Sequence, residues 1–287
     1  HYKDRHVIYG RCAHLTESRP IFIEQGRGVC MSRRICQRGC SLGGYFNANS
    51  TLIPWGLKTE NLTLKPNSVV HSILYDEDQK KAIGVRVIDS NSKVSQDYFA
   101  KVVFVSASTL NTNLILLNSK SKRFPNGLGN DNGLLGKFIA FHNYRATINA
   151  EFEGFPQYTT EGAKPTSHYI PRFRNVYRQE TDFLRGYAAG FGAQPNRETN
   201  KEGFGAELSN QLLSTKETGI WNVNSHMMGE TIPKESNLVS LDQEKTDAWG
   251  IPLLNIDVDY DGNDEKMIQD FYEQFSEMYE KSGFEKN

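Results

Sequence analysis

The sequence has little excess charge of either sign and no long apolar run. Its 287 residues include 33 lysines and arginines against 34 aspartates and glutamates, which gives a formal net charge of −1. A chain so nearly neutral has no global electrostatic attraction to nucleic acid or to an anionic membrane. No apolar run approaches the roughly 18 residues that a membrane-spanning helix needs. These absences exclude a nucleic-acid-binding protein and a membrane-spanning one.

Cysteines are also few, and several catalytic motifs are missing. Four cysteines in a chain of 287 residues are too few for a disulfide scaffold. The sequence contains no G-x-S-x-G, H-E-x-x-H or P-loop motif. Its seven histidines have no obvious partner, and we interpret His142 and His226 as hydrogen-bonded structural residues. The chain therefore carries no complete catalytic constellation by itself.

What the sequence does contain points to a globular protein. Its 13 tyrosines and 16 phenylalanines argue against disorder and predict a real core. The chain opens at His1 without an initiator methionine or a signal-peptide pattern, and it stops soon after an amphipathic segment. We interpret it as a fragment of a longer protein.

Residue patterns predict a loop-rich beginning followed by strands. Residues 1 to about 60 hold all four cysteines and few periodic runs, which is typical of loops. Alternating β-branched runs from residue 62 to residue 89 predict a strand meander. The uniformly apolar run 101–105 predicts a strand buried on both faces, as in a parallel sheet. Small residues follow it and lead into a predicted helix over 110–118, a geometry in which backbone N–H groups can meet a phosphate or nucleotide.

The second half predicts a different architecture. Aromatic and polar residues alternate along 138–155, 169–174 and 253–260, which predicts large half-buried strands in a mostly antiparallel sheet. Apolar residues at helical spacing predict one amphipathic helix over 264–281.

The cysteines form the sharpest local motif. Cys30, Cys36 and Cys40 are spaced C-x5-C-x3-C, with three arginines among them that favour thiolates. This spacing is not a common zinc pattern, and zinc usually has four ligands. An iron-sulfur cluster with three cysteine ligands agrees better with the number of cysteines in the motif. A disulfide with one spare thiol, or ordinary buried thiols, are the alternatives. Cys12 is either a fourth ligand or a small buried side chain.

Further motifs run in order over nearly the whole chain. They are G-C-S-L-G-G-Y-F at residues 39–46 and the segments 51–54, 61–70, 84–87, 101–109, 123–130, 135–142, 172–175 and 230–252. With them the chain resembles the glucose-methanol-choline (GMC) oxidoreductase family, in particular its bacterial branch of sugar and gluconate dehydrogenase-like flavoproteins.

The resemblance implies an FAD enzyme that oxidises a CH–OH group of a sugar or other alcohol by hydride transfer to the flavin. The implied fold class is α/β plus α+β. Residues 1–135 would form the later half of a Rossmann-like FAD-binding domain, with a Cys-rich loop at 26–50. Residues 136–287 would form an incomplete substrate-binding domain, a large antiparallel sheet backed by helices. The dinucleotide motif would precede His1 and the catalytic histidine motif would follow Asn287, so the catalytic residues are unknown and the chain alone should be inactive.

The resemblance also assigns cofactor-binding residues. Val70 matches a valine whose backbone meets the FAD adenine, and Ser106, Ala107 and Ser108 match a small-residue turn that approaches the FAD. His142 matches a family histidine, but Phe141 precedes it here where an acidic residue is usual, so we give His142 no catalytic role.

For the cysteines, the resemblance implies a metal centre and partners. Cys30, Cys36 and Cys40 match the ligands of a three-iron iron-sulfur cluster that passes electrons toward a cytochrome or small-subunit partner. The same branch of the family would place the protein in the bacterial periplasm.

Two other functions are consistent with the residues alone. One is a stand-alone metal-binding or electron-carrier module, although the long aromatic region exceeds what a cluster carrier needs. The other is a non-catalytic sugar-binding domain whose aromatic side chains stack on pyranose rings.

Overall fold

The computed structural model describes residues 4–33, 36–153, 168–195, 202–214 and 220–286. The chain forms two compact units, each assembled from separate stretches of sequence. The first unit combines His1–Thr63, His142–Thr231 and Asp261–Asn287, and the second combines Leu64–Phe141 and Ile232–Tyr260. The predicted functional division at residue 135 stays a prediction, because these units are defined by packing alone. No helix in the described ranges is both long and apolar enough to cross a membrane.

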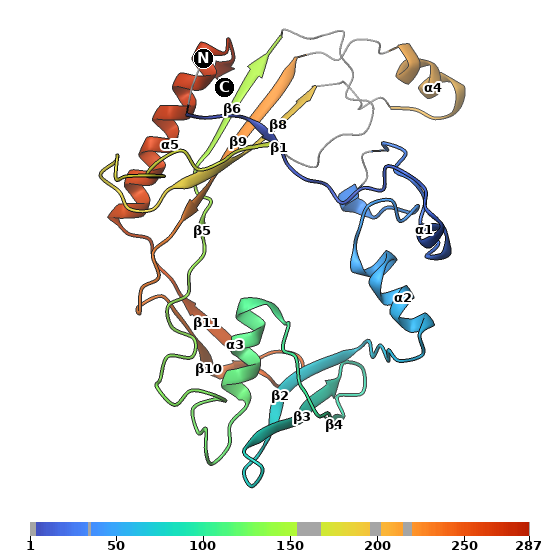
Figure 1. Cartoon of the computed structure of the whole chain (residues 1–287), viewed down its shortest axis with the longest axis vertical. Helices are drawn as coiled ribbons and strands as arrows, with labels where there is room; N and C mark the ends of the chain where they lie inside the picture. The colour runs from blue at the N-terminus through green and yellow to red at the C-terminus, as the bar shows by residue number, and fades with distance from the viewer. Residues whose placement is uncertain (1–3, 34–35, 154–167, 196–201, 215–219, 287) are drawn as a thin grey trace. The chain divides into compact units, whose positions relative to one another are not determined.

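An antiparallel sheet dominates the first unit, as the aromatic alternation of the second half predicts (Figure 1). Its strands lie in the order β1-β7-β8-β9-β6-β12, and β5 also pairs with β9. The strands are β1 Ile8–Tyr9, β5 His142–Asn143, β6 Thr147–Phe152, β7 His168–Ile170, β8 Tyr187–Pro195, β9 Trp221–Glu230 and β12 Glu285–Lys286.

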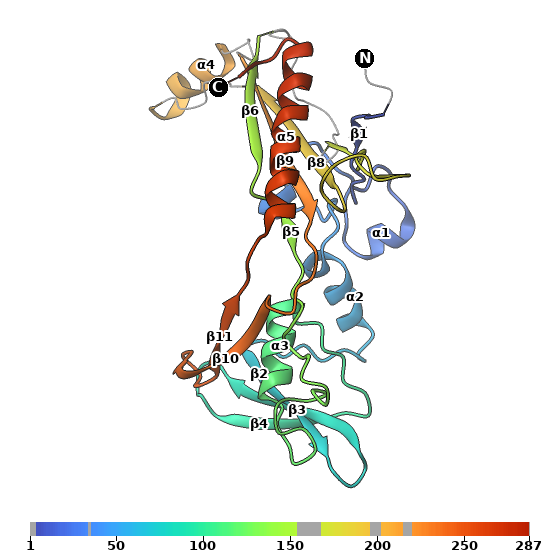
Figure 2. The same ribbon diagram turned by 90° about the vertical axis from the view of Figure 1, so that its left-hand side faces the viewer.

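One long helix, α5 (Gly262–Lys281), lies along one face of this sheet, as both views show (Figure 2). Asp261 caps its first turn through a capping box with Asp264. Met267, Phe271 and Phe275 recur at helical spacing and are completely buried. The phenyl rings of Phe271 and Phe275 stack with their centroids 4.4 Å apart. The predicted helix over 264–281 is therefore confirmed.

The remaining elements of the first unit are short, in agreement with the loop-rich prediction for residues 1–60. They are α1 Pro20–Glu24, the 3-10 turns Cys36–Arg38 and Ala48–Ser50, α2 Leu52–Lys58 and α4 Gly205–Ser214. Helix α4 is absent from the sequence-based prediction.

The second unit contains the predicted meander. Its strands are β2 Ser68–Asp76, β3 Lys81–Asp89 and β4 Ser95–Phe99, and a separate hairpin consists of β10 Leu238–Thr246 and β11 Pro252–Asp257. The segment 62–64 is not a strand, and β4 was not predicted. Helix α3 (Ser108–Asn118) packs against β2, β10 and β11, which confirms the predicted helix over 110–118.

The predicted buried strand over 101–105 is wrong for this structure. These residues form no strand, and the side chains of Val102 and Phe104 are 64% and 88% exposed. The physical reason is the lack of a neighbour, because all pairings among the described strands are antiparallel and none includes this run. The fold is thus mixed α/β with antiparallel sheets.

Candidate functional site

The three motif cysteines line one small pocket in the first unit, together with His14. Backbone contacts hold the surrounding segments together. The Cys30 N–H donates to the Leu15 carbonyl at 2.9 Å, and the Leu15 N–H donates to the Gly44 carbonyl at 2.8 Å. A Cβ atom at Gly44 would lie 3.0 Å from the Gly28 carbonyl oxygen, so glycine at position 44 permits this close approach.

His14 lies beside the three cysteines in this thiol pocket, and sequence reasoning missed it. Its Nε2 atom lies 3.3 Å from the Cys36 sulfur, and its ring packs against the Tyr45 ring with centroids 5.2 Å apart. Cys12, the predicted alternative fourth ligand, instead has its thiol 3.7 Å from the Gly10 carbonyl oxygen. The only sequence signal was the presence of His14 two residues after Cys12.

The electrostatics of the thiol pocket favour a thiolate at Cys40. The backbone N–H of Tyr45 contributes most to lowering the pKa of the Cys40 thiol. Burial opposes this effect, while the N–H groups of Leu42 and Gly44 and the charge of Arg33 act with it. N–H groups directed at a sulfur are typical surroundings of iron-sulfur ligands.

The thiol pocket, as far as the chain is described, does not have the arrangement of a site for a single metal ion. Among the residues that the structure places, no three His, Cys, Asp or Glu side chains are arranged around one metal ion. A cluster does not require this convergence, because each cysteine binds a different iron. The space between the side chains is about 20 Å³, room for roughly one water molecule, so a cluster would fit only after the described cysteine side chains moved apart.

The predicted FAD-binding residues all lie in the second unit. Ser106 and Ala107 precede α3, and Ser108 is its first residue. Ala107 occupies the N-cap position without a side-chain hydrogen bond, and the first turn carries no acidic residue. The N–H groups at this end of α3 therefore have no side-chain cap and can bind an anionic or polar group. The small side chains of this turn leave its backbone accessible, which fits the approach of a nucleotide.

Val70 lies in β2, beside an irregularity of the β2–β3 register between Val70 and Ser72. Helix α3 packs on the same strand, where Ser119 at its far end accepts a 2.7 Å hydrogen bond from the Ile73 N–H. The structure thus places Val70 and the 106–108 turn on two elements that pack together.

The face of the large sheet opposite α5 carries both polar and apolar side chains, and we call it the open face. Side chains alternate between the two faces of a strand, so Val223, Ser225 and Met227 of β9 face α5 while Asn224 and His226 point the other way. The polar side chains of the open face include Thr147, Asn149, Tyr169, Gln194, Asn222, Asn224 and His226. A groove of about 830 Å³ lies over the central strands.

Two glycines of β8 shape this groove. Gly190 and Gly192 pair with His226 and Asn224 of β9. The His226 ring lies directly over Gly190, because a Cβ atom added there would be 2.2 Å from two ring atoms. Asn224 donates a 2.7 Å hydrogen bond to the Asn149 side chain on β6. His226 is therefore held over the central strands of the open face, and its predicted role as a structural histidine stays a prediction.

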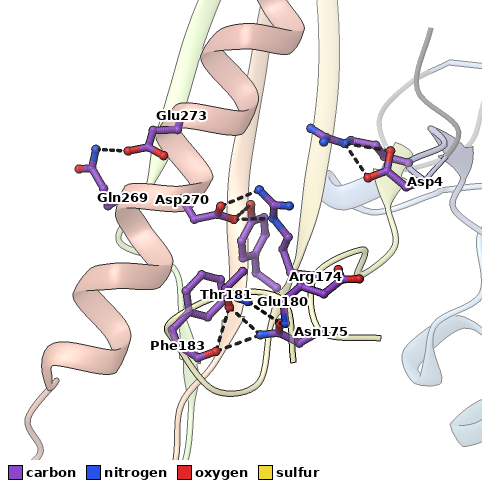
Figure 3. Close-up of polar contacts among 11 residues, drawn as sticks. Asp4, Arg174, Asn175, Glu180, Thr181, Phe183, Gln269, Asp270 and Glu273 are labelled. Carbon is purple, nitrogen blue, oxygen red and sulfur yellow. Dashed lines mark hydrogen bonds and ion pairs between the residues drawn. The ribbon is translucent and has the colours of Figure 1, made fainter. Parts of the chain in front are cut away.

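The loop after β7 is tied to α5 by a network of buried polar groups (Figure 3). Arg174 donates two hydrogen bonds to the Asp270 carboxylate, from Nη2 at 2.7 Å and from Nε at 3.0 Å. The Tyr187 hydroxyl donates to the same carboxylate at 2.7 Å. Burial alone would lower the pKa of Arg174, but the bonds to Asp270 outweigh it and the pKa is raised. Burial, and then Asp270, raise the pKa of Tyr187. Asn175 folds the loop by bonding Thr181, Phe183 and Arg185.

Comparison with known proteins identifies the family. Residues 21–142, a stretch that includes the thiol pocket cysteines, β2 and the 106–108 turn, match the family model described as GMC oxidoreductase. This stretch places the N-terminal part of the chain in the GMC oxidoreductase family. The family implies FAD as the cofactor.

Curated members of the family are similar over longer stretches. The chain is 32% identical over 202 residues to 2-methyl-1,2-propanediol dehydrogenase of Mycolicibacterium austroafricanum, covering 64% of this chain and 34% of that protein. It is 26% identical over 242 residues to the fructose dehydrogenase large subunit of Gluconobacter japonicus, covering 82% of this chain and 42% of that protein. The chain thus spans less than half the length of each of these two relatives.

Proposed function

We propose that the full-length protein is an FAD-dependent dehydrogenase that oxidises a CH–OH group of an alcohol or sugar. The match of residues 21–142 to the GMC oxidoreductase family carries this proposal. Two relatives are named as dehydrogenases of a diol and of fructose, which agrees with a CH–OH donor. Bound FAD would supply the acceptor for a hydride.

The chain's own residues would hold this cofactor. The accessible backbone of Ser106, Ala107 and Ser108 at the uncapped start of α3 suits close contact with a nucleotide. The backbone of Val70 in β2 would meet the adenine. In this proposal residues 1–135 belong to a Rossmann-like FAD-binding domain and residues 136–287 to the substrate-binding domain.

We further propose that Cys30, Cys36 and Cys40 hold a three-iron cluster. Their support is a shared pocket, the N–H groups that favour a Cys40 thiolate, and the absence of carboxylates among the residues that line the pocket in the described part of the chain. A bound cluster would supply one-electron transfer toward an external acceptor, such as a cytochrome partner.

The test is a visible spectrum with iron and sulfide assays on the anaerobically purified full-length protein. We expect flavin bands, and iron that is lost in Cys36→Ser. Ser106→Glu should lower flavin content severalfold, because a bulkier, charged side chain at this turn would block the close approach of the cofactor. Ser95→Glu, on the exposed start of β4, is the matched control and should retain flavin.

Each possible result has a distinct meaning. Flavin without iron would support the proposed dehydrogenase and reject the proposed cluster. Iron without flavin would favour an electron-carrier module. Wild-type protein with neither would contradict both proposals.

A further inference from the structure

The segment that forms most of the thiol pocket carries positive charge and no carboxylate. Residues 25–59 contain no aspartate and no glutamate, but they contain four arginines and one lysine. Their formal charge of +5 stands in a chain whose total is −1, so the remaining residues carry −6. A charge distributed this unevenly creates a positive field over one part of the surface of the protein.

Two of these arginines are exposed beside the cysteines, and we call the exposed side chains of Met31, Arg33 and Arg38 the basic rim. Met31 and Arg33 line the thiol pocket, and Arg38 ends the 3-10 turn that begins at Cys36. The Arg33 guanidinium donates to the Ser41 hydroxyl at 2.9 Å. Among the residues that the structure places, no carboxylate lies within ion-pair distance of either arginine, so neither charge is neutralised by a neighbour.

These positive charges exceed what the thiols use. The Tyr45 N–H contributes most to lowering the pKa of the Cys40 thiol, and Arg33 is the only arginine that contributes. Arg27 has a structural role, because its guanidinium donates to the Gly43 carbonyl at 2.9 Å and packs on the Phe22 ring. The charge of Arg38 serves neither purpose and faces solvent.

An apolar side chain stands among the charges of the basic rim. Met31 borders the thiol pocket and is 71% exposed. Methionine and arginine are enriched at protein–protein interfaces, where aspartate and glutamate are depleted. Interfaces between electron-transfer partners are small, and complementary charge sets the rate at which the partners meet. The basic rim thus has the composition of a small docking surface.

We propose that the basic rim docks a one-electron acceptor protein that presents an acidic face. This inference rests on the proposed function, because it assigns the surface through which an acceptor reaches the three cysteines. The docked acceptor would gain one electron and the cluster would lose one, with no bond or proton exchanged. Opposite charge accelerates such an encounter, whereas like charge suppresses it, so a basic acceptor would be disfavoured.

The test compares an acidic acceptor protein with a basic one. The full-length protein is reduced anaerobically, freed of excess reductant and mixed by stopped flow with acidic plastocyanin or with basic mitochondrial-type cytochrome c. We expect plastocyanin to be reduced at least about tenfold faster than cytochrome c at low salt. This advantage should disappear between about 10 mM and about 500 mM salt, because salt screens exposed charges.

Variants of the basic rim locate the effect. Arg38→Glu and Met31→Glu each add negative charge there, and each should lower the rate with plastocyanin at low salt about three- to tenfold. Iron content and the visible spectrum show whether each variant keeps its cluster. Arg178→Glu is the matched control, because Arg178 is 83% exposed in the loop after β7 and lies outside the pocket lining. It should react at the wild-type rate.

Binding is measured separately from electron transfer, by NMR of isotope-labelled, cadmium-substituted plastocyanin, which accepts no electron. Salt-sensitive binding that Arg38→Glu and Met31→Glu both weaken would support the docking surface, and in a preparation without iron the same result would reject only the cluster. A protein that contains iron, but neither binds plastocyanin nor reduces it faster than cytochrome c, would keep the cluster and overturn the docking surface.

Two further results would also overturn the inference. If Arg178→Glu slowed the reaction as much as the rim variants do, the effect would come from the overall charge of the protein. If phosphatidylglycerol vesicles bound more tightly than plastocyanin, and Arg38→Glu abolished that binding, the basic rim would be a membrane-binding surface.

Discussion

His14 connects the thiol pocket to the rest of the first unit. Its backbone pairs with Tyr45 in an isolated bridge, its ring packs on the Tyr45 ring, and its Nε2 atom faces the Cys36 sulfur at 3.3 Å. In the tautomer with its proton on Nε2, His14 donates a hydrogen bond to that sulfur. Such bonds stabilise negative charge on a metal-bound thiolate and orient it.

We therefore predict that His14→Ala changes the properties of the proposed three-iron cluster in the full-length protein. Without the N–H···S bond the reduced, more negative state is less stable, so the midpoint potential should shift to more negative values. The rate at which a chelator removes iron should also rise about tenfold. This is the low end of the usual effect of removing a hydrogen-bond partner of a metal ligand. Potentiometric titration and the rate of iron release measure the two effects.

His14→Gln and Cys12→Ser are the controls for this prediction. The glutamine retains an N–H donor and should restore part of the shift, while Cys12 lies outside the pocket lining and its substitution should have no effect. If Cys12→Ser lost iron while His14→Ala kept its iron and its potential, Cys12 and not His14 would be the residue that supports the three cysteines.

At the scale of elements, α5 and the sheet stabilise each other through both apolar and polar contacts. The completely buried Phe271 and Phe275 pack under the sheet, and Asp270 joins Arg174 and Tyr187 to the same helix. The side chains of Arg174 and Asp270 are only 20% and 14% exposed. Removal of one charge would leave the other largely buried and unpaired, which is costlier than the loss of an exposed pair.

Asp270→Asn is accordingly expected to destabilise the first unit by about 3 kcal/mol, the low end for breaking a buried ion pair. Thermal or urea unfolding of the chain measures this loss. Glu277→Gln is the matched control on the same helix, because Glu277 pairs with Lys281 one turn away at the surface. Its melting temperature should equal that of the wild type. An equally small change in Asp270→Asn would mean that the network adds no stability.

At the scale of the whole molecule, apolar side chains of the second unit remain exposed in this chain. Phe99, Val102 and Phe104 are 70%, 64% and 88% exposed, although the run 101–105 has the composition of a buried strand. Such an exposed apolar run is typical of a surface that another segment covers. We infer that another segment of the full-length protein covers residues 101–105.

Hydrogen exchange tests this inference directly. Amides of residues 101–105 should exchange rapidly in the 287-residue chain and at least a hundredfold more slowly in the full-length protein. The amides of β3, which is paired on both sides, serve as the internal control and should be protected in both. Rapid exchange of 101–105 in both proteins would show that this run is a surface loop.

Local patterns allowed much of the fold to be predicted. The amphipathic repeat of α5, the alternation of β2 and β3, and the loop character of the first 60 residues depend on neighbours in sequence, so they could be predicted without a structure. The cysteine spacing likewise predicted a shared site. The run 101–105 was misjudged because a strand also needs a partner, and composition does not reveal whether one is present.

The sequence by itself determined the family, the helices and strands with strong periodicity, and the three thiols that face one pocket. Only the tertiary structure decided which residues join them. His14 is 22 residues from Cys36, and Asn149 is 75 residues from Asn224, so no local pattern connects either pair. The open face exists because antiparallel pairing of β6, β7, β8 and β9 brings every second side chain of each strand to one side of the sheet.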